Sequence, residues 1–129
     1  DRGAHKEIGW FDIELTAAAR AHPLLAGFPE RLEVMHWHGD TFALPPECTR
    51  IAASAACPEQ GYIHANGRVV GLQFHMEWDR AAARALVENC PEDLTPGPYV
   101  QEPAAILRDD APFADNNAWM ERLLDRLFL

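Results

Sequence analysis

The stretch "GYIHANGRVVGLQFHMEW", residues 61–78, decides the fold that the sequence predicts. Asn66-Gly67 stands between two runs rich in β-forming residues. Because Asn-Gly tolerates the positive φ angles of a type I′ turn, we expect a β-hairpin here. In its second arm Val69 and Val70 point to opposite faces, and both are apolar. A strand that is apolar on both faces is typical of a covered, central position in a sheet.

The residues on either side of the hairpin indicate further strands and then helices. After Trp78 the hydrophobic period changes and predicts a helix over residues 79–90, with Asp79 as its N-cap and Pro91 as its stop. Apolar residues at helical spacing predict another helix at the end of the chain, where Trp119 begins the stripe. Strands mixed with helices indicate the α/β class. The other expected strands cover residues 7–16, 31–44 with a turn at Gly39-Asp40, and 49–57.

The composition is typical of one domain, or part of one, with a real core, because 48% of the 129 residues are hydrophobic. The net charge of −9 and the lack of a Lys/Arg cluster disfavour nucleic acid and anionic membranes as partners. No stretch approaches the roughly 20 apolar residues of a membrane span. The segment "DRGAHKEIGW" lacks the apolar run of a signal peptide, and its start on Asp1 suggests that the chain begins within a domain. The sparse cysteines favour the reducing cytoplasm.

His75 and Glu77 are the first candidates for chemistry. Side chains two apart on an extended chain share a face. A carboxylate there can bond one imidazole nitrogen, fix the tautomer and leave the other nitrogen free to take and return a proton. Open α/β sheets also place their sites at the ends of central strands. Taken alone, H-x-E is more often a histidine and a glutamate that meet solvent at the end of a strand.

Several segments resemble those of class I glutamine amidotransferases. "VVGLQFHMEW" is similar to the family's last triad segment, which reads G-x-Q-F-H-x-E. "VMHWHGDTFALPPECTRIAASAAC" resembles the segment that in GMP-synthase-like members reads as a strand, S-H-G-D, a loop with L-P, then A-S and a cysteine. "EIGWFDIELT", "PGPYVQ" and "LLDRL" resemble further parts of the same domain.

The resemblance covers nearly the whole chain and implies a flavodoxin-like α/β fold, in which the second arm of the antiparallel hairpin is inserted in a mostly parallel sheet. Residues 1–129 would form the C-terminal half of an amidotransferase domain whose nucleophile-bearing N-terminal half is absent. Residues 91–129 would be an irregular Pro-rich segment and the C-terminal helix of that same domain.

The family's chemistry gives the candidate residues their roles. A cysteine thiolate attacks the side-chain amide of glutamine, a γ-glutamyl thioester forms, ammonia leaves, and water then releases glutamate. By motif, His75 would be the base and Glu77 would orient it. The resemblance implies no cofactor for this step. It implies glutamine or another γ-glutamyl small molecule as substrate and, as partner, an ammonia-accepting synthase domain or subunit.

The nucleophile is missing from the sequence, because no G-x-C-x-G elbow occurs in it. The residue after such a nucleophile donates its backbone N–H to the oxyanion. Cys57 and Cys90 are each followed by a proline, which has no N–H, and Cys48 lies in "PPECT" without glycines. We therefore expect the isolated chain to be inactive. We also expect its apolar faces to be buried by the missing half or by self-association.

The segment "HWHGD" leaves two interpretations open. H-x-H places the imidazoles of His36 and His38 on one face, as in half of a metal site, but Asp40 is too close and Glu47 too far to add a carboxylate. A metal-dependent enzyme is therefore the least favoured alternative, and we expect no metal. The resemblance instead implies that the backbone around Trp37 holds the amino-acid end of glutamine.

Gln73 completes the candidate residues for substrate binding. It shares a face with His75 and would support the site or serve in packing. The full set of candidate substrate-binding residues is His36, Trp37, His38 and Gln73. A non-catalytic binding or regulatory module with the same fold remains the main alternative to an enzyme.

Overall fold

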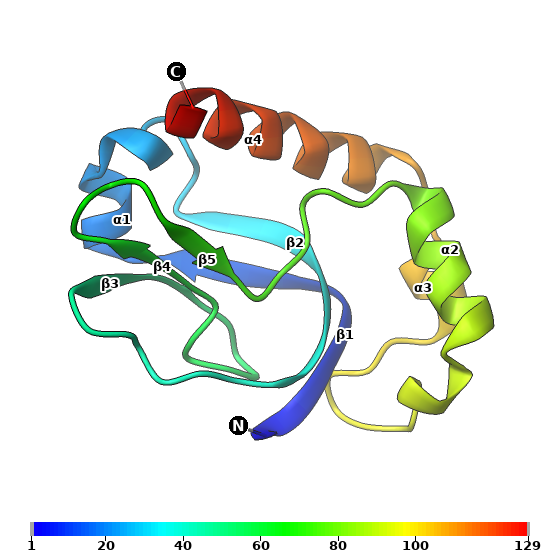
Figure 1. Ribbon diagram of the computed structural model, residues 1–129. Helices are drawn as coiled ribbons and strands as arrows, with labels where there is room; N and C mark the ends of the chain where they lie inside the picture. The colour runs from blue at the N-terminus through cyan, green and yellow to red at the C-terminus, as the bar shows by residue number, and fades with distance from the viewer. Residues whose placement is uncertain (1, 129) are drawn as a thin grey trace.

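A computed structural model describes residues 2–128, which form a curled five-stranded sheet flanked by helices (Figure 1). The strands are β1 (Arg2–Leu15), β2 (Arg31–Asp40), β3 (Cys48–Ala53), β4 (Gly61–His64) and β5 (Val70–Leu72). The helices are α1 (Ala17–Ala21), α2 (Arg80–Asn89), α3 (Pro103–Ile106) and α4 (Ala111–Phe128), with single 3₁₀ turns η1 (Pro23–Leu25) and η2 (Pro91–Asp93).

The sheet has the strand order β2-β1-β3-β4-β5, and each of its ladders is antiparallel. The α/β class is confirmed, whereas the expectation of a mostly parallel sheet is wrong for residues 2–128. The physical reason is the length of the connections. Short loops join β3 to β4 and β4 to β5, and parallel neighbours need a crossover of about a dozen residues or more.

The predicted hairpin is present as β4 and β5, but its turn differs from the expected type I′. The N–H of Gly67 donates to the carbonyl of His64 at 2.9 Å, and within this turn only Gly67 has a positive φ, of 70°. This pattern is typical of a turn followed by a glycine bulge. Within residues 2–128, β5 lies at the edge of the sheet and Val69 is 47% exposed. The expected central position is therefore not seen, because β4 is the only strand among residues 2–128 that pairs with β5.

Alternation along β1 divides the core into two parts. Ile13 and Leu15 point to one face, where α1, η1 and the last turns of α4 cover them. Ile8 and Trp10 point to the other face, where α2, α3 and Phe113 from the start of α4 cover them. Buried residues alternate in this way when both faces of a strand are packed.

Both predicted helices form. Asp79 caps α2, since its Oδ1 accepts the N–H of Ala82 at 2.8 Å. The stripe on α4 is confirmed in part: Leu123 is buried, but Leu124 and Phe128 are 42% and 76% exposed. No helix formed by residues 2–128 combines the length and the apolar character needed to cross a bilayer.

Residues 99–101 run beside β1 on the side opposite β2, next to the part of β1 that β3 does not reach. The N–H of Ile8 donates to the carbonyl of Tyr99 at 2.8 Å, and the N–H of Gln101 donates to the carbonyl of Ile8 at 2.9 Å. The side-chain amide of Gln101 then pairs with both backbone groups of Trp10, at 2.9 and 3.0 Å. Gly9 permits this approach, because it has a φ of 122° and its Cα faces the Gln101 side chain.

Replacing Gly9 by alanine is expected to lower the free energy of unfolding by about 1–3 kcal/mol. An added Cβ would lie 2.3 Å from Oε1 of Gln101, and the alanine would also have to adopt the positive φ. Urea unfolding of the purified protein measures the loss. Gly97→Ala is the matched control, because its Cβ would meet only a methyl group of Val100 at 3.6 Å. Equal stability of the two variants would contradict this prediction.

Candidate active site

The extended chain that follows β5 positions His75. The N–H of His75 donates to the carbonyl of Met35 at 2.8 Å and forms an isolated antiparallel bridge to β2. Phe74 and Met76 are buried in the core, with exposed fractions of 4% and 2%. Because side chains alternate along an extended chain, His75 and Glu77 are directed away from that core.

His75 and Glu77 contact each other directly. Nδ1 of His75 lies 2.7 Å from Oε1 of Glu77, and the two side chains are 27% and 49% exposed. The indole of Trp78 stacks on the imidazole, with ring centroids 4.0 Å apart and an angle of 9° between the planes. Nε2 of His75 has no hydrogen-bond partner within residues 2–128, so it can exchange a proton with another group.

Two neighbouring asparagines on α4 hold the backbone around this pair. Oδ1 of Asn116 accepts the N–H of Met35 at 3.3 Å. Nδ2 of Asn117 donates to the carbonyls of Met76 and Trp78 at 2.7 and 3.0 Å. The helix therefore fixes both the strand beside the imidazole and the turn that carries the carboxylate and the indole.

The structure divides the predicted substrate-binding residues between two faces of β2. Trp37 points toward the His75 side, where its ring meets Trp78 edge-on at 6.4 Å between centroids. Nε2 of Gln73 donates to two backbone carbonyls, those of residues 40 and 59, at 3.0 and 3.3 Å. The amide of Gln73 therefore connects the end of β2 to the loop that precedes β4.

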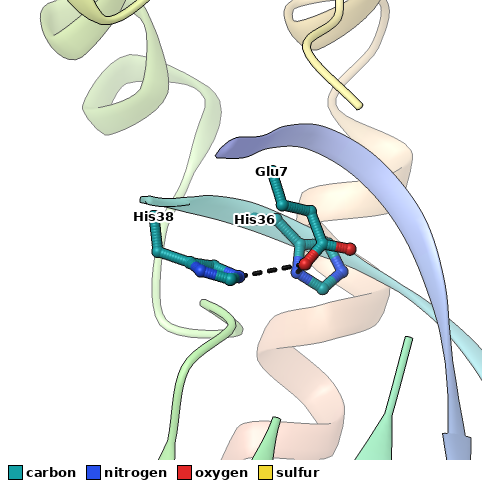
Figure 2. Close-up of side chains that lie close together, drawn as sticks. All are labelled: Glu7, His36 and His38. Atoms are coloured by element: carbon teal, nitrogen blue, oxygen red, sulfur yellow. Dashed lines mark hydrogen bonds and ion pairs between the residues drawn. The ribbon is translucent and has the colours of Figure 1, made fainter. Parts of the chain in front are cut away.

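His36 and His38 lie on the other face of β2 with Glu7 of β1 (Figure 2). Oε1 of Glu7 is 3.0 Å from Nε2 of His38 and 3.4 Å from Nδ1 of His36. Gln60 donates to the same oxygen at 2.6 Å. Glu7 and His36 are 0% exposed, so neither side chain can touch a substrate in this arrangement.

Burial controls the charges of this cluster. It lowers the pKa of His36 to about 4, although the negative charge of Glu7 acts in the opposite direction. The imidazole of His36 is therefore neutral at neutral pH. Burial would raise the pKa of Glu7, but the hydrogen bond with His38 and the attraction to His36 outweigh it, so this pKa is lowered and Glu7 is ionised.

The cysteines lie apart from the imidazole. Sγ of Cys57 is 3.3 Å from Oγ1 of Thr41 and 3.5 Å from the carbonyl oxygen of Glu59. Over residues 2–128 no cysteine lies within hydrogen-bonding distance of His75. Residues 2–128 thus place an imidazole beside a carboxylate, with no thiol next to them.

Sequence reasoning missed Glu7, Trp78 and Asn117. Glu7 was hidden because a carboxylate near the histidines was expected close to them along the chain, whereas the structure pairs Glu7 with His38 across two strands. Knowledge that residues 7–14 pair with residues 31–38 would have revealed it. Trp78 follows the H-x-E motif directly, but nothing in a single sequence shows that its ring turns back onto the histidine.

The family profile of class I glutamine amidotransferases matches residues 5–90, which include the His75–Glu77 pair and the strands that hold it. The chain belongs to this family. The amidotransferase chain is 40% identical over 89 residues to a putative glutamine amidotransferase-like protein, YfeJ, of Salmonella typhimurium, covering 69% of the chain and 37% of that protein. It is 31% identical over 90 residues to one subunit of the glutamine-hydrolyzing GMP synthase of Methanoculleus marisnigri, covering 68% of the chain and 47% of that protein.

Solved structures resemble the whole amidotransferase chain. A glutamine amidotransferase from Methylobacillus flagellatus superimposes with a TM-score of 0.89 at 31% identity, covering 98% of the chain and 53% of that protein. One from Thermotoga maritima gives a TM-score of 0.82 at 31% identity, with the same coverage of 98% and 53%. The chain therefore spans about half the length of these relatives.

Proposed function

We propose that His75 is the general base of a glutaminase site and that Glu77 orients it. The observation that supports this role most strongly is the 2.7 Å contact between Nδ1 and the carboxylate, which leaves Nε2 free on the exposed side of the ring. A carboxylate in this position holds the proton on Nδ1 and stabilises the imidazolium that forms during turnover. The stacked indole of Trp78 keeps the ring in one orientation.

The proposed reaction splits hydrolysis of a γ-glutamyl amide into two steps. Nε2 takes the proton from a cysteine thiol, the thiolate attacks the amide carbon, and the imidazolium returns the proton to the leaving ammonia. The imidazole then takes a proton from water, which attacks the thioester and releases glutamate and the thiol. The nucleophilic cysteine belongs to a G-x-C-x-G segment outside the described residues.

The substrate in this proposal is glutamine or another γ-glutamyl small molecule. The backbone around Trp37 holds the amino-acid end, since the ring of Trp37 contacts Trp78 and so places this stretch of β2 beside the imidazole. Ammonia passes to a synthase domain or subunit. This partner is suggested by the relative that is named as one subunit of a glutamine-hydrolyzing GMP synthase. We place this chemistry in a reducing compartment such as the cytoplasm, where a free thiol persists.

Residues 1–129 act in this proposal as the C-terminal half of the amidotransferase domain, and residues 91–129 are its closing segment. The half-length coverage of the solved relatives supports this division. The contacts of residues 99–101 with β1 support a single unit, because the closing segment is hydrogen-bonded to the first strand.

A glutamine hydrolysis assay tests the proposed division of the site. Residues 1–129 alone are expected to release no glutamate above the uncatalysed rate. Release is expected when a nucleophile-bearing segment is joined to them in the full-length protein. Circular dichroism establishes that the shorter chain is folded. Steady release by the isolated chain would contradict the missing-nucleophile proposal, and an inactive full-length protein with the segment present would favour a non-catalytic module.

A further inference from the structure

We propose that Glu7, His36 and His38 bind one divalent transition-metal ion of the zinc class, at a site that no step of the glutaminase chemistry uses. The three side chains come from two adjacent strands and converge on one point (Figure 2). Their potential ligand atoms all lie within 4.8 Å of one another. Two imidazoles and one carboxylate are a common ligand set for zinc and for other first-row divalent ions.

The tautomers of the two histidines point to a cation between them. Nε2 of His36 lies 3.1 Å from the carbonyl oxygen of Phe11, and Nδ1 of His38 lies 3.1 Å from that of Asp40. A carbonyl only accepts, so each of these nitrogens carries the proton. In the neutral form of each ring the other nitrogen carries a lone pair, and both of these nitrogens face the same oxygen of Glu7. Without a cation between them, His38 can bond Glu7 only as an imidazolium.

The lone pair of an imidazole nitrogen and a carboxylate oxygen repel each other unless a positive charge lies between them. Metal-binding histidines show the same arrangement, because they donate their second N–H to a backbone carbonyl, and the ligating carboxylate is itself hydrogen-bonded. Gln60 supplies that last contact through its bond to Oε1 of Glu7 at 2.6 Å. Its second N–H donates to Oγ of Ser54 at 2.9 Å, which fixes the amide in this orientation.

Two of the three distances between the ligand atoms match those of a metal site, and the third lies within 4.8 Å. Ligand atoms about 2.0–2.1 Å from a tetrahedral zinc ion are about 3.3 Å from one another. Oε1 of Glu7 lies 3.4 Å from Nδ1 of His36 and 3.0 Å from Nε2 of His38. A small movement of the side chains would therefore admit the ion.

Unsatisfied polar atoms also gather at this point. Across residues 2–128, only four buried side-chain nitrogen or oxygen atoms lack a hydrogen-bond partner. Three of them are Oε2 of Glu7, Nδ1 of His36 and Oε1 of Gln60. Each unsatisfied buried group costs about 1–3 kcal/mol, so three in one cluster indicate that a ligand belongs there.

The environment favours a structural ion over a catalytic one. The side chains of Glu7 and His36 are at most 1% exposed, and that of His38 is 9% exposed. His38, at the end of β2, therefore offers the path of entry. A bound ion would cross-link β1 and β2 directly beside Met35, whose carbonyl accepts the N–H of His75.

Zinc titration of the full-length, chelator-treated protein tests this proposal. We expect one zinc ion per chain by elemental analysis after dialysis, and a melting temperature that rises with added zinc. We expect His38→Gln to lower zinc affinity by at least about 100-fold, because even outer contacts of a metal site are worth about 10–100-fold. His64→Gln is the matched control, since His64 also faces a glutamate, Glu47, at 3.4 Å but lies outside the cluster.

X-ray absorption of the zinc-loaded wild type does not depend on the folding of any variant. It is expected to show two imidazole nitrogens and a carboxylate oxygen. The proposal would be overturned if the wild type bound no stoichiometric zinc. The contact between His38 and Glu7 would then be an imidazolium–carboxylate ion pair. Unchanged affinity in His38→Gln, or an equal loss in His64→Gln, would overturn the proposal as well.

Discussion

Replacing His75 by alanine in the full-length protein is expected to lower kcat/KM for glutamine hydrolysis by about 10²–10⁴-fold. The alanine variant can neither take the thiol proton nor return it to ammonia. The fold should tolerate the change, because the backbone N–H of residue 75 still reaches the carbonyl of Met35 and the ring, which stacks on Trp78, is part-exposed. Release of glutamate under steady-state conditions measures the loss.

The control for this variant is His64→Ala. His64 also faces a glutamate on the surface, at 3.4 Å from Glu47, but lies in the hairpin away from the extended segment that carries His75. We expect its activity to match the wild type. A His75→Ala enzyme that kept most of its activity would exclude His75 as the base.

Glu77→Gln is expected to lower kcat by about 10²-fold while KM stays nearly constant. Glu77 contacts Nδ1 of His75 at 2.7 Å, so the proposal assigns it a positioning role that acts through the imidazole. A glutamine can turn its N–H₂ group toward the ring, which favours the wrong tautomer and removes the charge that stabilises the imidazolium. Steady-state kinetics over a range of pH values measure the changes in kcat and in KM separately.

Two further variants make this result specific. Glu77→Asp keeps the charge and is expected to restore part of kcat, whereas a purely structural role would show no such rescue. Glu47→Gln removes the carboxylate opposite His64 and should leave the kinetics unchanged. A rise in KM without a fall in kcat for Glu77→Gln would instead place Glu77 in substrate binding.

The sequence predicted the elements near His75 well, because local signals determine them. Asn66-Gly67 marked the hairpin, and Asp79 marked the start of α2. The H-x-E spacing predicted that His75 and Glu77 share a face, and they lie 2.7 Å apart.

The sheet's architecture could not be predicted in the same way. Apolar residues on both faces of the second hairpin arm favoured a central strand, but β5 is an edge strand within residues 2–128. Strand order depends on which distant segments pair, and the period of a single segment does not encode this. Glu7 shows the same limit, because its contact with His38 arises only from the antiparallel register of β1 and β2.

The central claim is that the imidazole of His75, oriented by Glu77, exchanges the proton during turnover. The most direct test compares the NMR titration of the His75 ring nitrogens with the pH profile of kcat/KM, both measured on the full-length enzyme. We predict that Nδ1 carries the proton in the neutral ring, that one limb of the profile has the same midpoint as the His75 titration, and that both midpoints move together in Glu77→Gln. A His75 titration whose midpoint matches neither limb would contradict this account.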